Sequence, residues 1–144
     1  MGIDFYRKGG NVVIEACKSI KDKYKQNVEL YIAGLDIKVM SKYQDNGIHF
    51  LEKLSYDRLS YYFNLCDIFC MPSRFEAYGI TFIEALCYGL LCIGRDKFAM
   101  KEIIKDNYNG YLIQNDDSEN LAKKIFRIVN FAEINENIFR YSFL

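Results

Sequence analysis

The stretch from Met71 to Gly89, MPSRFEAYGITFIEALCYG, constrains the fold of this 144-residue chain more than any other. The apolar run Asp67–Met71 has the length of a strand and is closed by Pro72, whereas Thr81–Tyr88 carries apolar residues at helical spacing. The first turn of a helix presents unpaired N–H groups that favour an anion such as phosphate. The stretch therefore predicts a strand, a tight loop and a helix, with a candidate phosphate site at Gly79, Ile80 and Thr81.

Two carboxylates, Glu76 and Glu84, lie eight residues apart on either side of this predicted helix start. A carboxylate in contact with phosphate would repel it, but its two oxygens accept hydrogen bonds from the hydroxyls of a sugar ring. A nucleotide-sugar has hydroxylated rings on both sides of a diphosphate and fits this pattern. The spacing alone leaves a second interpretation open, in which both carboxylates are simply solvated.

The rest of the chain alternates between short apolar runs and segments of helical periodicity, which indicates βαβ units and a parallel sheet. Met1–Tyr6 has room only for the end of a strand, and 131–144 is expected to be helical or frayed. We expect an α/β, Rossmann-like fold with helices on both faces of the sheet. Ligands bind at the carboxyl ends of such strands, and the loops carrying Lys8, Leu54 and Glu76 all follow predicted strands. The predicted strands are Val28–Ala33, Ile48–Leu51, Leu91–Gly94 and Gly110–Ile113, and helices are predicted over 13–24, within 36–46, after Ser55, over 98–104 and after Asp117 or Ser118.

Composition excludes several other classes of protein. Nineteen basic residues balance nineteen acidic ones, which argues against nonspecific nucleic-acid binding, and there is no polybasic membrane signal, long apolar run or signal peptide. The five cysteines form no CxxC pair, so we expect buried, reduced thiols of a cytoplasmic protein rather than a metal site or disulfides. These are Cys17, Cys66, Cys70, Cys87 and Cys92.

The segment 75–86, FEAYGITFIEAL, resembles the Glu-x7-Glu motif of retaining GT-B glycosyltransferases, the family 4-like members of glycosyl transferases group 1. Lys8-Gly9-Gly10 upstream and 109–112, NGYL, downstream fall in the family's order, so the resemblance covers nearly the whole chain. Two positions depart from it, because Ile3 stands where many members have arginine and Leu91 where they usually have proline.

The resemblance implies that residues 1–130 form the donor-binding domain, the C-terminal half of a GT-B fold, with 131–144 a partial tail and the N-terminal acceptor domain absent. Lys8 would contact the donor diphosphate, with Arg7 and Gly9 beside it, and Glu76 would hold the transferred sugar. The backbone around Leu54 would meet the base, and Glu84 would accept from the ribose diol. Ala77 and Tyr78 complete the expected donor-binding loop.

The implied function is transfer of a hexose, with retention, from a nucleotide diphosphate sugar to a glycan or lipid acceptor. UDP is expected in preference to GDP as the carrier. No cofactor or metal is expected, since no Asp-x-Asp motif is present. Any peripheral contact with the inner face of the membrane would come from the missing domain.

Two alternatives remain open. The chain could be a degenerate, non-catalytic nucleotide-binding or assembly domain of the same fold, which the departure at Ile3 favours. It could instead be a general dinucleotide-binding or flavodoxin-like domain, which the absence of G-x-G-x-x-G disfavours.

Overall fold

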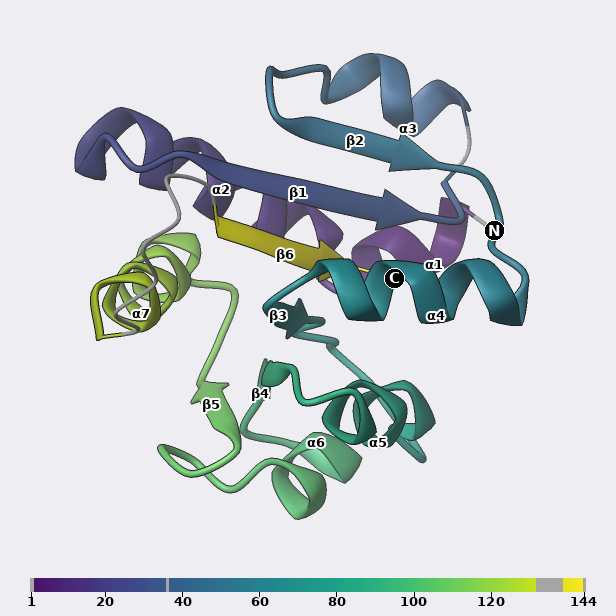
Figure 1. Cartoon of the computed structure of the whole chain (residues 1–144), viewed down its shortest axis with the longest axis vertical. Helices are drawn as coiled ribbons and strands as arrows, with labels where there is room; N and C mark the ends of the chain where they lie inside the picture. Colours follow the sequence, from purple (N-terminus) through teal and green to yellow (C-terminus); the bar gives the residue numbers. More distant parts are fainter. Residues whose placement is uncertain (1, 36, 132–138, 144) are drawn as a thin grey trace.

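The computed structural model describes residues 2–35, 37–131 and 139–143 as a parallel six-stranded sheet with helices on both faces (Figure 1). The strand order is β2-β1-β6-β3-β4-β5. The strands are β1 (Val28–Ala33), β2 (Ile48–Leu51), β3 (Ile68–Cys70), β4 (Leu91–Arg95), β5 (Gly110–Ile113) and β6 (Phe139–Phe143). The helices are α1 (Gly2–Arg7), α2 (Gly10–Tyr24), α3 (Ile37–Lys42), α4 (Tyr56–Leu65), α5 (Ile80–Cys87), α6 (Phe98–Ile103) and α7 (Ser118–Phe131). The predicted α/β class is therefore confirmed, as is the strand–loop–helix around Gly79, formed by β3 and α5. The other four predicted strands are also confirmed, as β1, β2, β4 and β5.

The start of the chain differs from its prediction, because 2–7 is the helix α1 and not the end of a strand. The Lys8 amide donates to the Asp4 carbonyl at 2.8 Å, and Asp4 and Arg7 form an ion pair one turn apart. Phe5 is buried against Gly10, where an added Cβ would lie 2.1 Å from the Phe5 ring. Burial of this aromatic ring at the start of α2 stabilises the helix, so Lys8 follows a helix and not a strand.

The end of the chain also differs from its prediction, because 139–143 forms β6 in the middle of the sheet. Phe139–Phe143 pairs in parallel with Val28–Ile32 on one side, and Tyr141 pairs with Ile68 on the other. A strand at this place provides hydrogen-bond partners for edges of β1 and β3 that would otherwise lack them. Counting β6 as the first strand gives the doubly wound order 3-2-1-4-5-6. Of the tail expected over 131–144, residues 132–138 and 144 lie outside the described residues.

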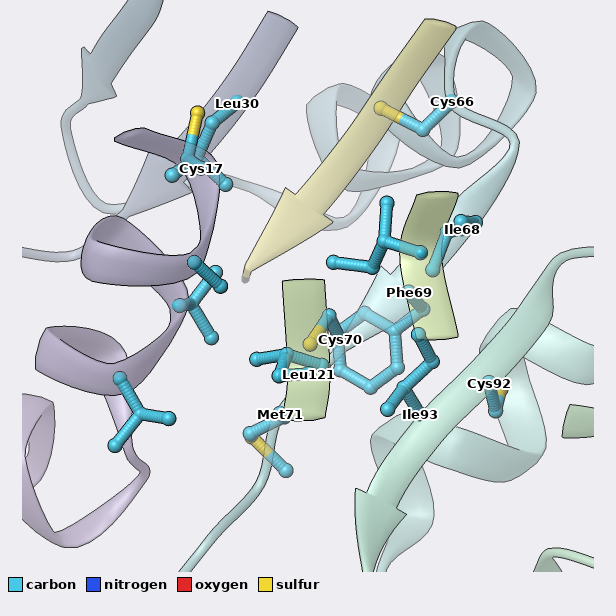
Figure 2. Packing of buried hydrophobic residues seen from close by; sticks show 14 of the residues in the cluster. Cys17, Leu30, Cys66, Ile68, Phe69, Cys70, Met71, Cys92, Ile93 and Leu121 are labelled. Carbon is cyan, nitrogen blue, oxygen red and sulfur yellow. The ribbon is translucent and has the colours of Figure 1, made fainter. Parts of the chain in front are cut away.

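Packing on both faces explains why β3 is buried along its whole length and β4 along nearly all of it. Figure 1 shows α4 in front of β6 and α2 behind β1, and α2 also contacts α7. Figure 2 shows Phe69, Cys70 and Ile93 gathered with Leu121 of α7 in the core, and all four are fully buried. This double burial is typical of parallel sheets.

All five cysteines are free thiols, but the expectation that all are buried is wrong for Cys87, which is exposed at the end of α5. Burial raises the pKa of the Cys70 thiol, with a smaller effect from neighbouring Cys92, and burial raises the pKa of Cys92 to about 12. Among the described residues, no helix has the length and apolarity needed to cross a membrane.

Candidate functional site

An open pocket of about 240 Å³ lies at the carboxyl edge of the sheet, where loops from β1, β2 and α1 meet the start of α5. Three residues predicted from the sequence, Lys8, Leu54 and Thr81, line it together. The sheet topology therefore brings residues from three separate segments of the chain to one pocket. Its other lining residues are Asp4, Phe5, Ala33, Gly34, Leu35, Lys53 and Leu59.

The pocket has an excess of positive charge. Its one acidic side chain, Asp4, lies 3.1 Å from the Arg7 guanidinium and is therefore neutralised. Within the described residues, the ammonium groups of Lys8 and Lys53 have no ion pair or hydrogen bond. Two uncompensated cations at a partly enclosed pocket favour an anionic ligand.

The start of α5, which meets the pocket at Thr81, presents free backbone amides. Gly79 is the N-cap residue, with φ of 64°, and its carbonyl accepts from the Phe82 amide at 3.0 Å. A left-handed backbone at this residue favours glycine. In the described part of the chain, the amides of Ile80 and Thr81 have no protein acceptor, as expected for the first turn of a helix.

Glu76 is held against this helix start from two sides. Its Oε1 accepts from the Gly79 amide at 3.3 Å, and its carbonyl accepts from the Ala99 amide at 3.2 Å. Oε2 accepts no hydrogen bond from the described residues. The Glu76 carboxylate is thus oriented by one oxygen and has the other available, while the Gly79 amide is already occupied by protein.

Arg7 and Gly9 connect the Lys8 loop to the loop that follows β3. The Arg7 guanidinium donates to the Phe75 carbonyl at 2.6 Å as well as pairing with Asp4, so it is engaged within the protein. Gly9 has φ of 82°, and a Cβ on it would lie 2.6 Å from the Pro72 carbonyl oxygen. Both residues therefore contribute contacts between the two loops.

Of the residues predicted between Glu76 and Glu84, Thr81 alone lines the main pocket; Glu76, Ala77, Tyr78, Gly79, Ile80 and Glu84 do not. Glu84 lies one turn along α5 from Thr81 and lines a small neighbouring hollow with Tyr56, Ser60 and Tyr88, which shares Leu59 with the pocket. Ala77 is exposed, and the Tyr78 side chain is 78% exposed.

Sequence reasoning missed the contribution of the loop after β1, where Ala33, Gly34 and Leu35 line the pocket. The rule that ligands bind at the carboxyl ends of parallel strands could have found these residues, because they end a predicted strand. The side chains of Asp4 and Phe5 could not have been found this way, since α1 was not predicted.

Comparison with known proteins assigns this geometry to a class and then to a family. A parallel, doubly wound α/β domain of this strand order belongs to the Rossmann-like class of folds. The chain belongs to the glycosyl transferases group 1 family, of the GT-B superfamily, whose model matches residues 1–142.

Relatives of known sequence are longer than this chain. An uncharacterized glycosyltransferase of Methanocaldococcus jannaschii is 24% identical over 132 residues, which are 92% of this chain and 38% of that protein. The phosphatidyl-myo-inositol mannosyltransferase of Mycobacterium leprae is 25% identical over 85% of this chain and 34% of its own length. The chain thus spans little more than a third of the length of these relatives.

Solved structures share the fold. Anabaena HepE in complex with UDP-glucose superposes with a TM-score of 0.74 at 16% identity, over 89% of this chain and 37% of that one. The pneumococcal O-GlcNAc transferase GtfA in complex with UDP and GlcNAc gives a TM-score of 0.67 at 24% identity, over 92% and 27% of the two chains. The Rossmann-like architecture expected from the sequence is confirmed by these neighbours.

Proposed function

We propose that this chain is the donor-binding domain of a retaining glycosyltransferase that moves a hexose from a UDP-sugar to a glycan or lipid acceptor. The observation that carries the proposal is that Lys8 and Thr81 line one pocket, where the amides of Ile80 and Thr81 have no acceptor among the described residues. An ammonium group and two helix amides form a site for a diphosphate.

The proposed chemistry follows from where charge develops. When the bond between the anomeric carbon and the diphosphate breaks, negative charge grows on the phosphate and positive charge on the sugar. Lys8 and the α5 amides stabilise the departing phosphate, and a single preorganised donor of this kind contributes about 3 kcal/mol. In the retaining reaction, the acceptor attacks from the face that the phosphate leaves, and the phosphate takes the acceptor's proton.

The two carboxylates have different proposed partners. The free Oε2 of Glu76 accepts from hydroxyls of the transferred sugar, while Oε1 keeps the carboxylate oriented through the Gly79 amide. Glu84 reaches the ribose diol from the hollow beside the pocket. They are therefore not the acid and base of a glycosidase, although paired carboxylates have that role elsewhere.

UDP as the carrier is supported by the two structural relatives, which were solved with UDP-glucose and with UDP. No metal is proposed, because Lys8, Lys53 and the helix amides supply the positive charge that a diphosphate needs. Affinity for UDP is therefore expected to be the same in EDTA and in magnesium. A clear loss of binding in EDTA would contradict this part of the proposal.

Isothermal titration of the chain with UDP, UDP-glucose and GDP-mannose tests the proposal. Lys8→Gln is expected to lower the affinity for UDP by about tenfold or more, since a charge-assisted hydrogen bond contributes about 1.5–3 kcal/mol to binding. Lys105→Gln is the matched control, because Lys105 is exposed and does not line the pocket. Equal affinities of the two variants would contradict the assignment of the diphosphate to Lys8.

A second candidate is a binding or assembly domain that has lost the chemistry. It is favoured by the Glu76 carboxylate, which is tied to the Gly79 amide rather than free on both oxygens. No binding of any of the three nucleotides would support this candidate. We propose that the acceptor side comes from outside these 144 residues, so full sugar transfer by the isolated chain would contradict that part of the proposal.

A further inference from the structure

A cluster of two arginines and an aspartate lies at the carboxyl edge of the sheet, outside the lining of the pocket. Arg74 follows β3, Arg95 is the last residue of β4, and Asp116 follows β5, three strands that are neighbours in the sheet (Figure 1). Asp116 Oδ2 lies 3.0 Å from Arg74 Nε and 2.8 Å from its terminal nitrogen, and Oδ1 accepts from Arg95. Asp116 thus bridges two guanidinium groups.

Arg95 is buried, with 8% of its surface exposed, although an arginine is rarely buried unless it is paired. Besides Asp116, it donates to the Pro72 carbonyl at 3.3 Å, while its Nε has no partner in the described residues. The Asp116 carboxylate is therefore the only negative charge within ion-pair distance of Arg95 among the described residues.

The cluster contacts both the Lys8 loop and the loop that leads to Glu76. Arg74 donates from its side chain to the Tyr6 carbonyl, and its amide donates to the Arg7 carbonyl at 2.7 Å. The buried Ser73 hydroxyl lies 3.2 Å from the same Arg7 carbonyl. Arg74 thus binds the end of α1, just before Lys8, and Arg95 binds the loop that leads to Glu76 through the Pro72 carbonyl.

We propose that Arg74, Arg95 and Asp116 are positioning residues, which fix the spacing between the Lys8 loop and the Glu76 loop without touching the ligand. The consequence for nucleotide affinity rests on the proposed function. Without the Asp116 carboxylate, the buried Arg95 guanidinium has no counterion among the described residues. The Arg74 guanidinium also loses the carboxylate that orients it. The two loops then separate, while the rest of the sheet stays paired.

Amide hydrogen exchange in the full chain tests the positioning directly. In Asp116→Asn, the Arg74 amide is expected to exchange about tenfold faster than in the wild type, because a local opening needs less free energy. The Leu30 amide, bonded to the Gly47 carbonyl at 2.8 Å in a distant part of the sheet, is expected to stay unchanged. Asp117→Asn is the matched control, because it removes the neighbouring charge and asparagine can still cap α7 through the Asn120 amide.

Three results of the exchange experiment would overturn the proposal: an unchanged exchange rate of the Arg74 amide, equal acceleration of the Arg74 and Leu30 amides, or the same acceleration in Asp117→Asn. A second arm measures UDP affinity, which is expected to fall about tenfold in Asp116→Asn and to stay constant in Asp117→Asn. Unchanged affinity in Asp116→Asn would also overturn it. If the wild type binds no nucleotide, the proposed function fails, and the exchange arm still decides whether the cluster holds the loops.

Discussion

Replacing Gly9 by alanine tests whether the Lys8 loop and the Pro72 loop are in direct contact. Gly9 has φ of 82°, and its added Cβ would lie 2.6 Å from the Pro72 carbonyl oxygen and 2.9 Å from Pro72 Cγ. The left-handed backbone costs an alanine about 1–2 kcal/mol. Overpacking against atoms that cannot move freely costs about 1–3 kcal/mol more. We therefore expect the free energy of unfolding to fall by about 2–5 kcal/mol.

Gly89→Ala is the matched control for this prediction. Gly89 has φ of 80° but nothing within 4 Å of an added Cβ, so it bears only the backbone cost. The effect of alanine on the unfolded chain is the same at both positions and cancels in the difference. Urea unfolding of the two variants should thus differ by about 1–3 kcal/mol. Equal losses of stability would refute the contact between Gly9 and Pro72.

Three further predictions concern stability and reactivity. Burial would raise the pKa of Asp116, but hydrogen bonds from Arg95 and then Arg74 outweigh it and hold that pKa below its usual range. Because the pKa is lowered in the folded state, ionised Asp116 stabilises the fold above about pH 4, and this contribution is lost as the pH falls further. The difference in unfolding free energy between the wild type and Asp116→Asn should therefore shrink from pH 6 to pH 3. A thiol reagent at pH 8 should modify Cys87 alone in the folded chain, because Cys70 and Cys92 are buried with raised pKa values; rapid labelling of more than one thiol would contradict the packing. Gly110→Ala should destabilise the fold by about 2 kcal/mol or more in urea unfolding, because its Cβ would lie 1.9 Å from the Cys92 carbonyl oxygen, and a loss within about 0.5 kcal/mol would show that β5 does not lie so close to β4.

Local patterns in the sequence determined most of the elements. The alternating, β-rich segment that ends at Gly34 predicts β1, and the helical spacing after Gly79 predicts α5 because one face must be buried. The order of these elements also predicts that the loops carrying Lys8, Leu54 and Glu76 lie at one edge of the sheet. Lys8 and Leu54 do line one pocket there, together with Thr81, but Glu76 does not line it, and Lys8 follows the helix α1 instead of a strand.

Tertiary contacts decided the two ends of the chain. Residues 2–7 are helical because Phe5 packs on Gly10, and 139–143 is a strand because β1 and β3 both offer it backbone partners. Each segment is too short for its own periodicity to select a structure, so the surroundings select it.

The details of the candidate site were decided in the same way. The sequence places Arg74, Arg95 and Asp116 far apart and gives none of them a motif, yet three neighbouring strands bring them into one cluster. The spacing of Glu76 and Gly79 likewise does not predict that one oxygen of the Glu76 carboxylate accepts a hydrogen bond from the Gly79 amide. Side-chain direction and charge pairing depend on contacts between distant segments. The sequence therefore indicated the edge of the sheet at which the candidate site lies, and only the folded structure decided which groups at that edge are free of protein partners.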